Sequence, residues 1–566
     1  MSILRNVNSP KDIKLLDIPQ LEQLAAEIRE LILSVVLEKG GHLSSNLGVV
    51  ELIIALHYVF DFDSDRLILD VGHQCYAHKI LTGRKDDFLT LRTKDGISGF
   101  PKSEESVYDA ANTGHSSTSI SLACGLLRAD IGDEKEIVTL IGDGAMTGGL
   151  VYEALNDAST LHKKFIAIIN NNDMSISVNV GGIAEYLRDL DSIRKPFSEY
   201  GISYFGSVDG HNLSDLISMF ARAKSAEKSI IINVHTIKGK GYAEAEAHPD
   251  KYHSYNPSAR QGKTFSSVMG NKLAALAKAD KDIFAITAAM ADGTGLDAVK
   301  AAAPGQFADV GIAEQHALCM ASGMAMGGKK PYFAVYSSFL QRAYDQVIHD
   351  MCLNDCDVTL CIDRAGFVSG DGETHQGLYD ISFLRSIPNM TVFAPKDYRE
   401  LEDALDFSVE YTHPLAIRYP KYDLTRQYDT HAPVKLGKWE VVRDCGGEVV
   451  ILACGALMND IAMKLAKALG NIDVINARFV KPLDTDMLRA IADRKIMTME
   501  DNVLAGGFGS AVLEYYNFVD LHPRIKIKAV DDITMTHASL GELLEMSGFG
   551  LEQLTSEIKQ LIDEIR

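Results

Sequence analysis

The sequence predicts an α/β protein of three domains, each built on a mostly parallel sheet flanked by helices. Two observations lead to this fold class. Short runs rich in β-branched residues alternate with segments of helical period along the chain, which is the pattern of βαβ units. Two polar, turn-rich segments interrupt the alternation and divide it into three blocks.

The predicted strands are short and recur throughout the chain. They include Arg66–Val71, Ile137–Ile141, Phe165–Asn170, Ser229–Thr236, Ile283–Thr287, Val358–Asp363, Met390–Ala394, Val449–Cys454 and Ile496–Glu500. Helical periodicity is clearest in Gly148–Ala158, Phe265–Lys278 and Ile461–Leu469. Because helices separate the strands, we expect parallel pairing through crossover connections.

The two interrupting segments are the predicted domain boundaries. The first is Ala247–Lys263 and the second is Pro420–Lys435. We therefore expect domains at residues 1–255, 256–430 and 431–566, each of an ordinary size for a domain.

The composition excludes several classes of protein. Of 566 residues, 46% are hydrophobic and 23% are charged, which argues against a disordered or fibrous chain. The 56 Lys and Arg against 77 Asp and Glu give a net charge of -21, which argues against non-specific binding to nucleic acid or an anionic membrane.

Location and cysteine chemistry are also constrained. No segment reaches the roughly 18 consecutive apolar residues of a membrane helix, and Met1–Gln20 lacks the features of a secretory signal. A cytoplasmic protein is therefore expected. The eight cysteines show no zinc-site spacing, so buried free thiols are expected in place of a metal or disulfide framework.

The most informative segment is Ile137–Met174, a predicted strand–helix–strand unit. The first strand runs into Gly142-Asp143-Gly144, and the second ends at Asn170-Asn171-Asn172. Neighbouring parallel strands end at the same edge of a sheet, so Asp143 and one of the asparagines should converge there. Their oxygens suit Mg²⁺ or Ca²⁺, and the glycines let the backbone approach an anion.

This pattern predicts a metal-bridged diphosphate at the sheet edge. The alternative is a simple turn and a polar loop that only end two strands. Either piece alone would favour that alternative, whereas both pieces at one βαβ spacing favour the metal site.

With these motifs the chain resembles the transketolase-like thiamine diphosphate enzymes, and within them the 1-deoxy-D-xylulose-5-phosphate synthase family. The resemblance runs from about Pro10 to the C-terminus. The matching segments are Gly41–Leu52, Asp70–Gly83, Gly114–Ser121, Met174–Ser177, Ile312–His316, Tyr336–Gln346, Asp363–Gly377, Arg478–Asp484 and Glu500–Gly509.

The resemblance implies a transketolase-like fold and a defined reaction. Residues 1–255 would bind Mg²⁺ and the cofactor diphosphate, 256–430 would bind the pyrimidine, and 431–566 would form a C-terminal domain. The enzyme would condense pyruvate with D-glyceraldehyde 3-phosphate, releasing CO₂ and 1-deoxy-D-xylulose 5-phosphate. This product would supply isoprenoid, thiamine and pyridoxal biosynthesis. A homodimer is implied as well.

The resemblance also assigns residues to the cofactor. Mg²⁺ would be held by Asp143, Asn172 and the carbonyl of Met174. Thiamine diphosphate would contact His73, His115, Gly144, Ala145, Asn172, Lys238, Glu314 and Phe339. Glu314 would be the acid beside the pyrimidine, with a pKa raised by burial, and Phe339 would stack on that ring.

Further residues are assigned to the substrates and to proton transfer. Arg342 and Arg418 would bind the acceptor phosphate, and Tyr336, Arg364 and Asp371 would line the same site. His42, His73 and His375 join Glu314 as catalytic candidates, because imidazole titrates near neutral pH. His253 is a weaker candidate. We expect structural or surface roles for His57, His162, His349 and His413, and a tight strand–helix turn at Gly506–Gly509.

The chain departs from the family after Ser177. Only Val178–Tyr200 stands where the longer synthases carry a more extended segment, which in them could cover the active site. Val178 stands where Glu is common, and Asn171 stands where Asp is common. No catalytic candidate is lost with the shortened segment.

Three other functions are alternatives to the synthase. A transketolase shares the two motifs, but the contexts of Met174–Ser177, Tyr336–Gln346 and Asp363–Gly377 favour the synthase. A catalytically silent, cofactor-binding paralogue is supported only by the shortened segment. A Rossmann dehydrogenase is excluded, because no strand is followed by GxGxxG in a suitable unit.

Overall fold

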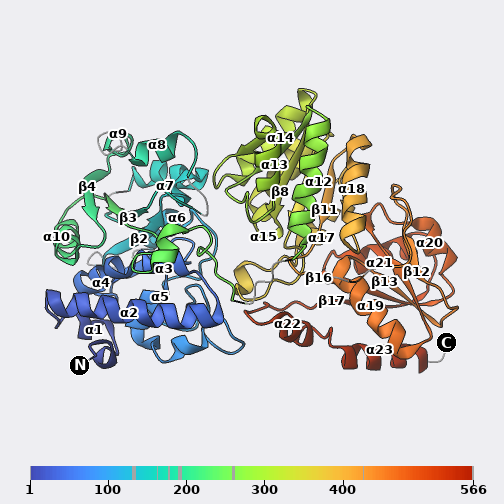
Figure 1. Ribbon diagram of the computed structural model, residues 1–566, viewed down its shortest axis with the longest axis horizontal. Helices are drawn as coiled ribbons and strands as arrows, with labels where there is room; N and C mark the ends of the chain where they lie inside the picture. The colour runs from blue at the N-terminus through green and yellow to red at the C-terminus, as the bar shows by residue number, and fades with distance from the viewer. Residues whose placement is uncertain are drawn as a thin grey trace. The chain divides into compact units, whose positions relative to one another are not determined.

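The computed structural model describes residues 2–129, 135–161, 163–175, 179–188, 194–257, 262–424, 426 and 428–563. The chain forms two compact units (Figure 1). Unit 1 comprises Met1–Arg260 with Gly311–Ala313 and Gly370–Thr374. Unit 2 comprises Gln261–Val310, Glu314–Ser369 and His375–Arg566.

Unit 1 contains one five-stranded parallel sheet in the order β1-β2-β3-β5-β4. Its strands are β1 (Arg66–Leu69), β2 (Ile137–Gly142), β3 (Ile166–Asn171), β4 (Ser203–Asp209) and β5 (Ile230–His235). Its α-helices are α1 (Pro10–Ile13), α2 (Ile18–Lys39), α3 (Leu43–Leu47), α4 (Val50–Val59), α5 (Tyr76–Lys79), α6 (Ser119–Arg128), α7 (Gly149–Ala158), α8 (Gly182–Arg188), α9 (Arg194–Glu199), α10 (Leu213–Lys224) and α11 (Ala243–Ala247). Shorter helical turns are η1 (Leu4–Asn6), η2 (Ile80–Arg84), η3 (Asp87–Thr90), η4 (Ala145–Thr147) and η8 (Gly372–Thr374).

The sheet of unit 1 is buried on both faces. Successive side chains of a strand point to opposite faces, so Val138 and Leu140 of β2 join one hydrophobic cluster and Ile137 and Ile141 join another. Burial on both sides explains why the central strands are almost wholly aliphatic.

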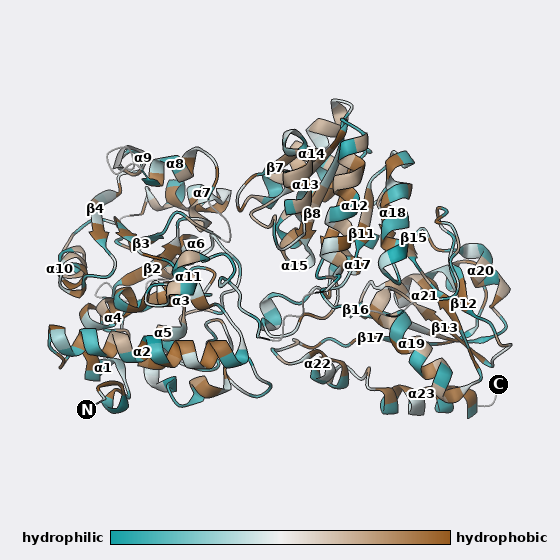
Figure 2. Ribbon diagram, in the orientation of Figure 1, coloured by the Kyte–Doolittle hydropathy of each residue, from teal (hydrophilic) through white to brown (hydrophobic). Residues whose placement is uncertain are grey.

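Helix α2 shows how the local sequence sets an element. Asp17 caps its first turn by accepting the Gln20 N–H, while the Gln20 side chain accepts the Asp17 N–H. Gly40, at φ 85°, follows the last helical residue and ends the helix. The buried side chains of α2 recur at helical spacing: Leu21, Leu24, Ala25, Ile28, Ile32, Val35 and Val36. Figure 2 shows the resulting alternation of brown and teal along α2.

Unit 2 contains two sheets. The seven-stranded sheet has the order β15-β10-β11-β9-β8-β6-β7, and the five-stranded sheet has the order β12-β14-β13-β16-β17. The strands are β6 (Ile283–Thr287), β7 (Phe307–Asp309), β8 (Lys330–Tyr336), β9 (Thr359–Asp363), β10 (Thr391–Phe393), β11 (Leu415–Arg418), β12 (Glu440–Arg443), β13 (Val449–Ala453), β14 (Ile472–Asn476), β15 (Phe479–Lys481), β16 (Lys495–Val503) and β17 (Arg524–Val530). Only the edge strands β15 and β12 pair antiparallel among these.

The helices of unit 2 lie on both faces of these sheets (Figure 1). They are α12 (Phe265–Ala279), α13 (Asp297–Ala302), α14 (Glu314–Met326), α15 (Ser337–Leu340), α16 (Tyr344–Gln346), α17 (Asp380–Arg385), α18 (Tyr398–Glu410), α19 (Ala456–Leu469), α20 (Thr485–Ala490), α21 (Phe508–Phe518), α22 (Leu540–Met546) and α23 (Leu551–Asp563). Shorter turns are η5 (Pro304–Gln306), η6 (Gln341–Ala343) and η7 (Val347–Cys352). The predicted fold class of mostly parallel sheets flanked by helices is confirmed.

Several smaller expectations can also be compared with the fold. Gly506 and Gly507 lie between β16 and α21, and Phe508 and Gly509 begin α21, as expected for a strand–helix turn. All eight cysteines are free, and six are buried as expected, whereas Cys319 and Cys445 are exposed. Among the residues that the structure describes, no helix has both the length and the apolar character needed to cross a membrane.

A buried charged network joins the two sheets of unit 2. Arg478, between β14 and β15, is almost fully buried and donates to Glu400 Oε1 of α18 at 3.2 Å. Its remaining N–H groups donate to the carbonyls of Lys438, Ala432 and Pro433 at 2.8–2.9 Å. Arg478, the first residue of the Arg478–Asp484 segment, therefore connects several elements within unit 2.

Replacing Arg478 by Met should destabilise the protein strongly. The apolar side chain would leave the buried Glu400 carboxylate without this partner, and such a loss costs about 3–5 kcal/mol. The exposed Arg489→Met is the matched control. Thermal and urea unfolding measure both variants, and equal midpoints for the two would contradict a structural role for the network.

Candidate active site

The parallel pairing of β2 with β3 brings the GDG and NNN motifs together. Gly142 is paired with Asn170, so Asp143 follows one strand where Asn171 and Asn172 end the next. Asp143 Oδ2 accepts the Asn172 N–H at 3.1 Å, and Oδ1 accepts the Gly144 N–H at 3.0 Å. The predicted convergence of Asp143 and Asn172 is confirmed.

Asp143 and Lys238 form a buried pair of opposite charges at this edge. Burial raises the pKa of Asp143 to about 6, although the N–H groups of Asn172 and Gly144 oppose the shift. Burial lowers the pKa of Lys238 to about 8, which the charge of Asp143 opposes. The Lys238 ammonium also donates to the Ser175 carbonyl, so it lies at the turn that follows β3.

The turn after β3 approaches the GDG motif closely. Asp173 has a φ of 62°, and Met174 donates its N–H to Asn172 Oδ1 at 3.3 Å. A Cβ on Gly144 would lie 2.7 Å from the Ser175 Cβ, so only glycine permits this approach. Ala145 is buried beside it, and its carbonyl accepts the Ser117 hydroxyl at 2.7 Å.

The donor atoms at this edge fit a hard divalent cation. A carboxylate, an amide oxygen and a backbone carbonyl, from Asp143, Asn172 and Met174, are oxygen ligands of the kind that Mg²⁺ takes together with phosphate oxygens. Within the described ranges, no group of three His, Cys, Asp or Glu side chains is placed to hold a metal ion. The assignment of these three residues to Mg²⁺ stays a prediction.

Three histidines gather in unit 1. The ring centroids of His42, His73 and His253 are 5.5–5.8 Å apart in every pair. Burial lowers the pKa of His253 well below its usual value, and Lys238, His73 and His42 add to the effect. His253, the weaker candidate from the sequence, therefore lies beside the two stronger ones.

Two further polar residues, Asn46 and Asp70, hold backbone groups of unit 1 in place, and Asn46 does so at the histidine cluster. Asn46 donates to the carbonyls of His42 and His73 at 2.6 and 2.7 Å. Asp70 accepts the N–H groups of Ser117 and Ser119 at 2.7 and 2.9 Å. Both residues lie inside segments that resemble the family. The resemblance therefore pointed to these segments, but it did not indicate the hydrogen bonds of Asn46 and Asp70.

His115 and Asp371 contact other parts of unit 1. His115 Nε2 lies 2.8 Å from the Thr374 carbonyl. Asp371 Oδ1 lies 2.7 Å from Nη1 of Arg92, a buried residue at φ 61°. Arg92 lies outside every segment that matched the family, so no sequence signal indicated it.

Unit 2 carries the remaining candidates. Glu314 is the first residue of α14 and is only 4% exposed. Burial raises the pKa of Glu314, and the charge of Arg342 opposes this. The nearest atoms of the two side chains, Arg342 Nη1 and Glu314 Oε2, are 3.9 Å apart, and Oε2 accepts no hydrogen bond from the described residues.

An aromatic group lies in the same unit. The Tyr336 and Phe339 rings stack at 5.3 Å, and His375 meets Phe339 edge to face at 5.6 Å. The guanidinium carbon of Arg364 lies 4.1 Å from the centre of the Tyr336 ring. The structure thus brings four predicted site residues together.

The arginines assigned to phosphate already have anionic partners. Arg418 is buried and donates to Asp380 and Asp501, each at 2.8 Å. Arg364 forms an ion pair with Asp363 at 2.8 Å. Two carboxylates around Arg418 offset its charge locally, so phosphate binding by this residue stays a prediction.

The histidines expected to have structural roles are placed accordingly. His57 is buried, with Nε2 3.0 Å from His78 Nδ1. His349 and His413 pair with aspartates at the surface. His162 and Val178 lie outside the described residues.

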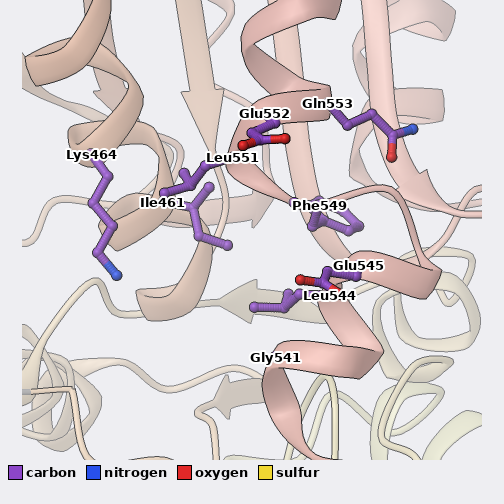
Figure 3. Close-up of a pocket in the computed structure, with 10 residues that line it drawn as sticks. Ile461, Lys464, Gly541, Leu544, Glu545, Phe549, Leu551, Glu552 and Gln553 are labelled. Atoms are coloured by element: carbon purple, nitrogen blue, oxygen red, sulfur yellow. The ribbon is translucent and has the colours of Figure 1, made fainter.

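A pocket of about 600 Å³ lies elsewhere, in the C-terminal part of unit 2 (Figure 3). It is lined by Ile461, Lys464, Gly541, Leu544, Glu545, Phe549, Gly550, Leu551, Glu552 and Gln553. Leu544, Phe549 and Leu551 make the wall largely apolar, and no predicted site residue belongs to it. This pocket is separate from the candidate active site.

Comparison with known proteins identifies the family. The family profile for 1-deoxy-D-xylulose-5-phosphate synthase matches residues 4–196 and 189–236. The transketolase pyrimidine-binding and C-terminal domain profiles match residues 261–427 and 437–554. The synthase of Clostridium perfringens strain SM101 is 44% identical over 617 residues, covering 99% of this chain and 100% of that protein. The chain belongs to the 1-deoxy-D-xylulose-5-phosphate synthase family.

Other members of the 1-deoxy-D-xylulose-5-phosphate synthase family are similarly close. The synthase of Caldanaerobacter subterraneus subsp. tengcongensis is 43% identical over 625 residues, covering 100% of both chains. Among solved structures, the transketolase of Campylobacter jejuni is 18% identical, with a TM-score of 0.47, and covers 96% of this chain and 100% of that one.

The lengths of the aligned relatives agree with a shortened segment in this chain. They extend over 617 and 625 residues, whereas this chain has 566, so these synthases carry residues that this member of the family lacks. The family profile matches in two pieces that meet at residues 189–196, inside the Val178–Tyr200 segment. This agrees with the departure expected from the sequence.

Replacing Glu314 by Gln should stabilise the protein at neutral and alkaline pH. Burial raises the pKa of Glu314 above its usual 4.5, so the folded state opposes ionisation and loses stability as the pH rises through that pKa. Gln avoids this loss. Melting temperatures between pH 5 and 8 should diverge in favour of the variant as the pH rises, by about 2–4 °C per kcal/mol gained. The exposed Glu410→Gln serves as control, and a pH-independent difference would contradict the burial argument.

Proposed function

We infer that the chain condenses pyruvate with D-glyceraldehyde 3-phosphate and releases CO₂ and 1-deoxy-D-xylulose 5-phosphate. The observation that carries this inference is the 41–44% identity to synthases along nearly the whole chain. Every residue assigned to the cofactor or to the substrates is present in the chain. The product would feed isoprenoid, thiamine and pyridoxal biosynthesis, and we also propose a cytoplasmic homodimer.

The sheet edge of unit 1 would hold the diphosphate of the cofactor. Asp143, Asn172 and the Met174 carbonyl would hold Mg²⁺ against it. Gly144 lets the turn after β3 pack against the GDG motif, because Ser175 takes the place that a side chain would need. Lys238 supplies a buried positive charge beside Asp143, which favours an anion. His115 and Ala145 would line the same edge.

Thiamine diphosphate, when bound, supplies the electron sink for decarboxylation. Glu314 would hold a proton beside the aminopyrimidine nitrogen. Its burial suits this role, because the raised pKa lets the carboxyl keep a proton to a higher pH than an exposed glutamate would. Phe339 would orient the pyrimidine by stacking against it.

The histidines and arginines would serve the substrates. His42, His73 and His253 are close enough to exchange protons with one bound group, and His375 offers a further imidazole beside Phe339. Arg342 and Arg418 would bind the acceptor phosphate, with the Tyr336 hydroxyl beside them. Arg364 and Asp371 would line the donor and acceptor site. The ion pairs of Arg364 and Arg418 would hold their guanidinium groups in fixed orientations.

The deciding experiment is an assay of purified protein with thiamine diphosphate and Mg²⁺. CO₂ release from pyruvate is followed with and without D-glyceraldehyde 3-phosphate, and the product is identified by mass. We expect acceptor-dependent CO₂ release and a deoxyxylulose phosphate product. Glu314→Gln should lower turnover by roughly 10²–10⁴-fold, the usual contribution of acid–base catalysis. Ketol transfer without CO₂ would indicate a transketolase, and cofactor binding without either reaction would indicate a silent paralogue.

Replacing Asp143 by Ala should abolish Mg²⁺-dependent binding of thiamine diphosphate. The variant removes the only carboxylate among the proposed ligands, so the ion loses its main charge partner. Calorimetric titration of the cofactor at several Mg²⁺ concentrations measures the effect, with the exposed Asp157→Ala as control. An unchanged titration would refute the metal assignment.

A further inference from the structure

Helix α8 lies in the segment where this chain is shorter than its relatives, and it contacts the turn after β3. The helix is fixed to the core of unit 1 by Ala184 and Leu187, which are each 3% exposed. Leu187 belongs to the hydrophobic cluster that also contains Ile141 and Ile169 of the sheet. The helix is therefore anchored to the two strands whose ends carry the candidate metal ligands.

Asn171 connects α8 with the turn through both ends of its amide. Its Nδ2 donates to the Leu187 carbonyl at 2.7 Å, and its Oδ1 accepts the Asp173 N–H at 3.4 Å. Asn171 is almost fully buried, so these bonds form in a low-dielectric setting. An aspartate could accept the second bond but could not donate the first. Asn171 stands where Asp is common in the family, and the bond that its Nδ2 donates to the Leu187 carbonyl is a structural reason for this difference.

Arg188, the last residue of α8, provides a second connection. Its Nε lies 3.2 Å from Asp173 Oδ1, and its Nη2 donates to the Asn179 carbonyl at 3.1 Å. Asn179 in turn donates its N–H to the Asp173 carbonyl at 3.2 Å. Arg188 thus contacts Asp173 and Asn179 at once.

The held turn has a backbone conformation that needs support. Asp173 has a φ of 62°, which side-chain-bearing residues rarely adopt, and its neighbours Asn172 and Met174 are the candidate ligands. A small shift of the turn would move the Asn172 oxygen and the Met174 carbonyl together. Mg²⁺ demands near-ideal positions of its oxygen ligands, so its affinity depends on this turn staying in place.

We propose that α8 is a brace for the metal-binding turn, and that Asn171 and Arg188 are positioning residues for Asn172 and Met174. The proposal rests on the proposed function, which places Mg²⁺ at this turn. In this chain a short helix of seven residues fixes the turn within the segment that is longer in the relatives.

The test measures cofactor binding, not turnover. Full-length wild type, Asn171→Ala and Arg188→Met are titrated with thiamine diphosphate by calorimetry at increasing Mg²⁺ concentrations. Arg128→Met is the matched control, because Arg128 forms a comparable ion pair with Asp157 on the exposed surface of unit 1. Melting temperatures of the cofactor-free proteins report whether each variant is folded.

We expect both brace variants to need roughly tenfold more Mg²⁺ for half-maximal cofactor binding, the effect of losing one or two hydrogen bonds. Saturating Mg²⁺ should restore binding, because the oxygen ligands themselves are intact. If Asn171→Ala and Arg188→Met titrate like Arg128→Met, α8 does not position the metal-binding turn. The proposed function would be unaffected by that result. Wild-type binding that ignores Mg²⁺ would overturn the metal assignment and the brace with it. If Asn171→Ala fails to fold, the partly exposed Arg188→Met decides the question.

Discussion

The parallel register between β2 and β3 determines the candidate active site of unit 1. It places Asp143 where its carboxylate accepts the N–H of Asn172, so two segments separated by a helix become one set of oxygen ligands. The aliphatic strands are buried on both faces, so a change of register would disturb the packing of both hydrophobic clusters at once. The chemistry at the strand ends thus depends on the hydrophobic core beneath it.

Charges buried at the candidate sites are balanced to different degrees. Asp143 and Lys238 oppose each other's pKa shifts, so neither is isolated in the interior. Burial raises the pKa of Glu314, and the charge of Arg342, 3.9 Å away, opposes the shift without cancelling it. A carboxyl left under-compensated in this way costs stability, which is a common property of groups that hold a proton for catalysis.

Residue spacing alone predicted the fold class and the meeting of Asp143 with one of the asparagines that end β3, because both follow from local periodicity and the geometry of parallel sheets. The choice of Asn172 came from the family resemblance. The roles of Glu314 and Phe339 came only from the family resemblance, since a lone Glu or Phe carries no such information. The role of Arg92 was not predicted because its partner Asp371 lies far away in the sequence, and that of Asn46 because it also bonds His73, 27 residues further on. The carboxylates around Arg418 were unforeseen for the same reason: Asp380 and Asp501 reach it from different elements. Long-range pairing of buried polar groups is a property of the packing, not of any short segment.

Strand β15 makes the two sheets of unit 2 depend on each other. It belongs to the seven-stranded sheet, where it pairs with β10, yet it follows β14 of the five-stranded sheet, and Arg478 lies between the two. A recombination event that exchanged residues after β11 between distant relatives would replace the edge strand of one sheet together with the core of the other. In such a hybrid, the new segment would have to supply an aromatic ring against Phe393 and a positive charge beside Glu400, as Phe479 and Arg478 do in this chain. Evolution is therefore expected to exchange unit 2 as a whole more readily than either of its sheets.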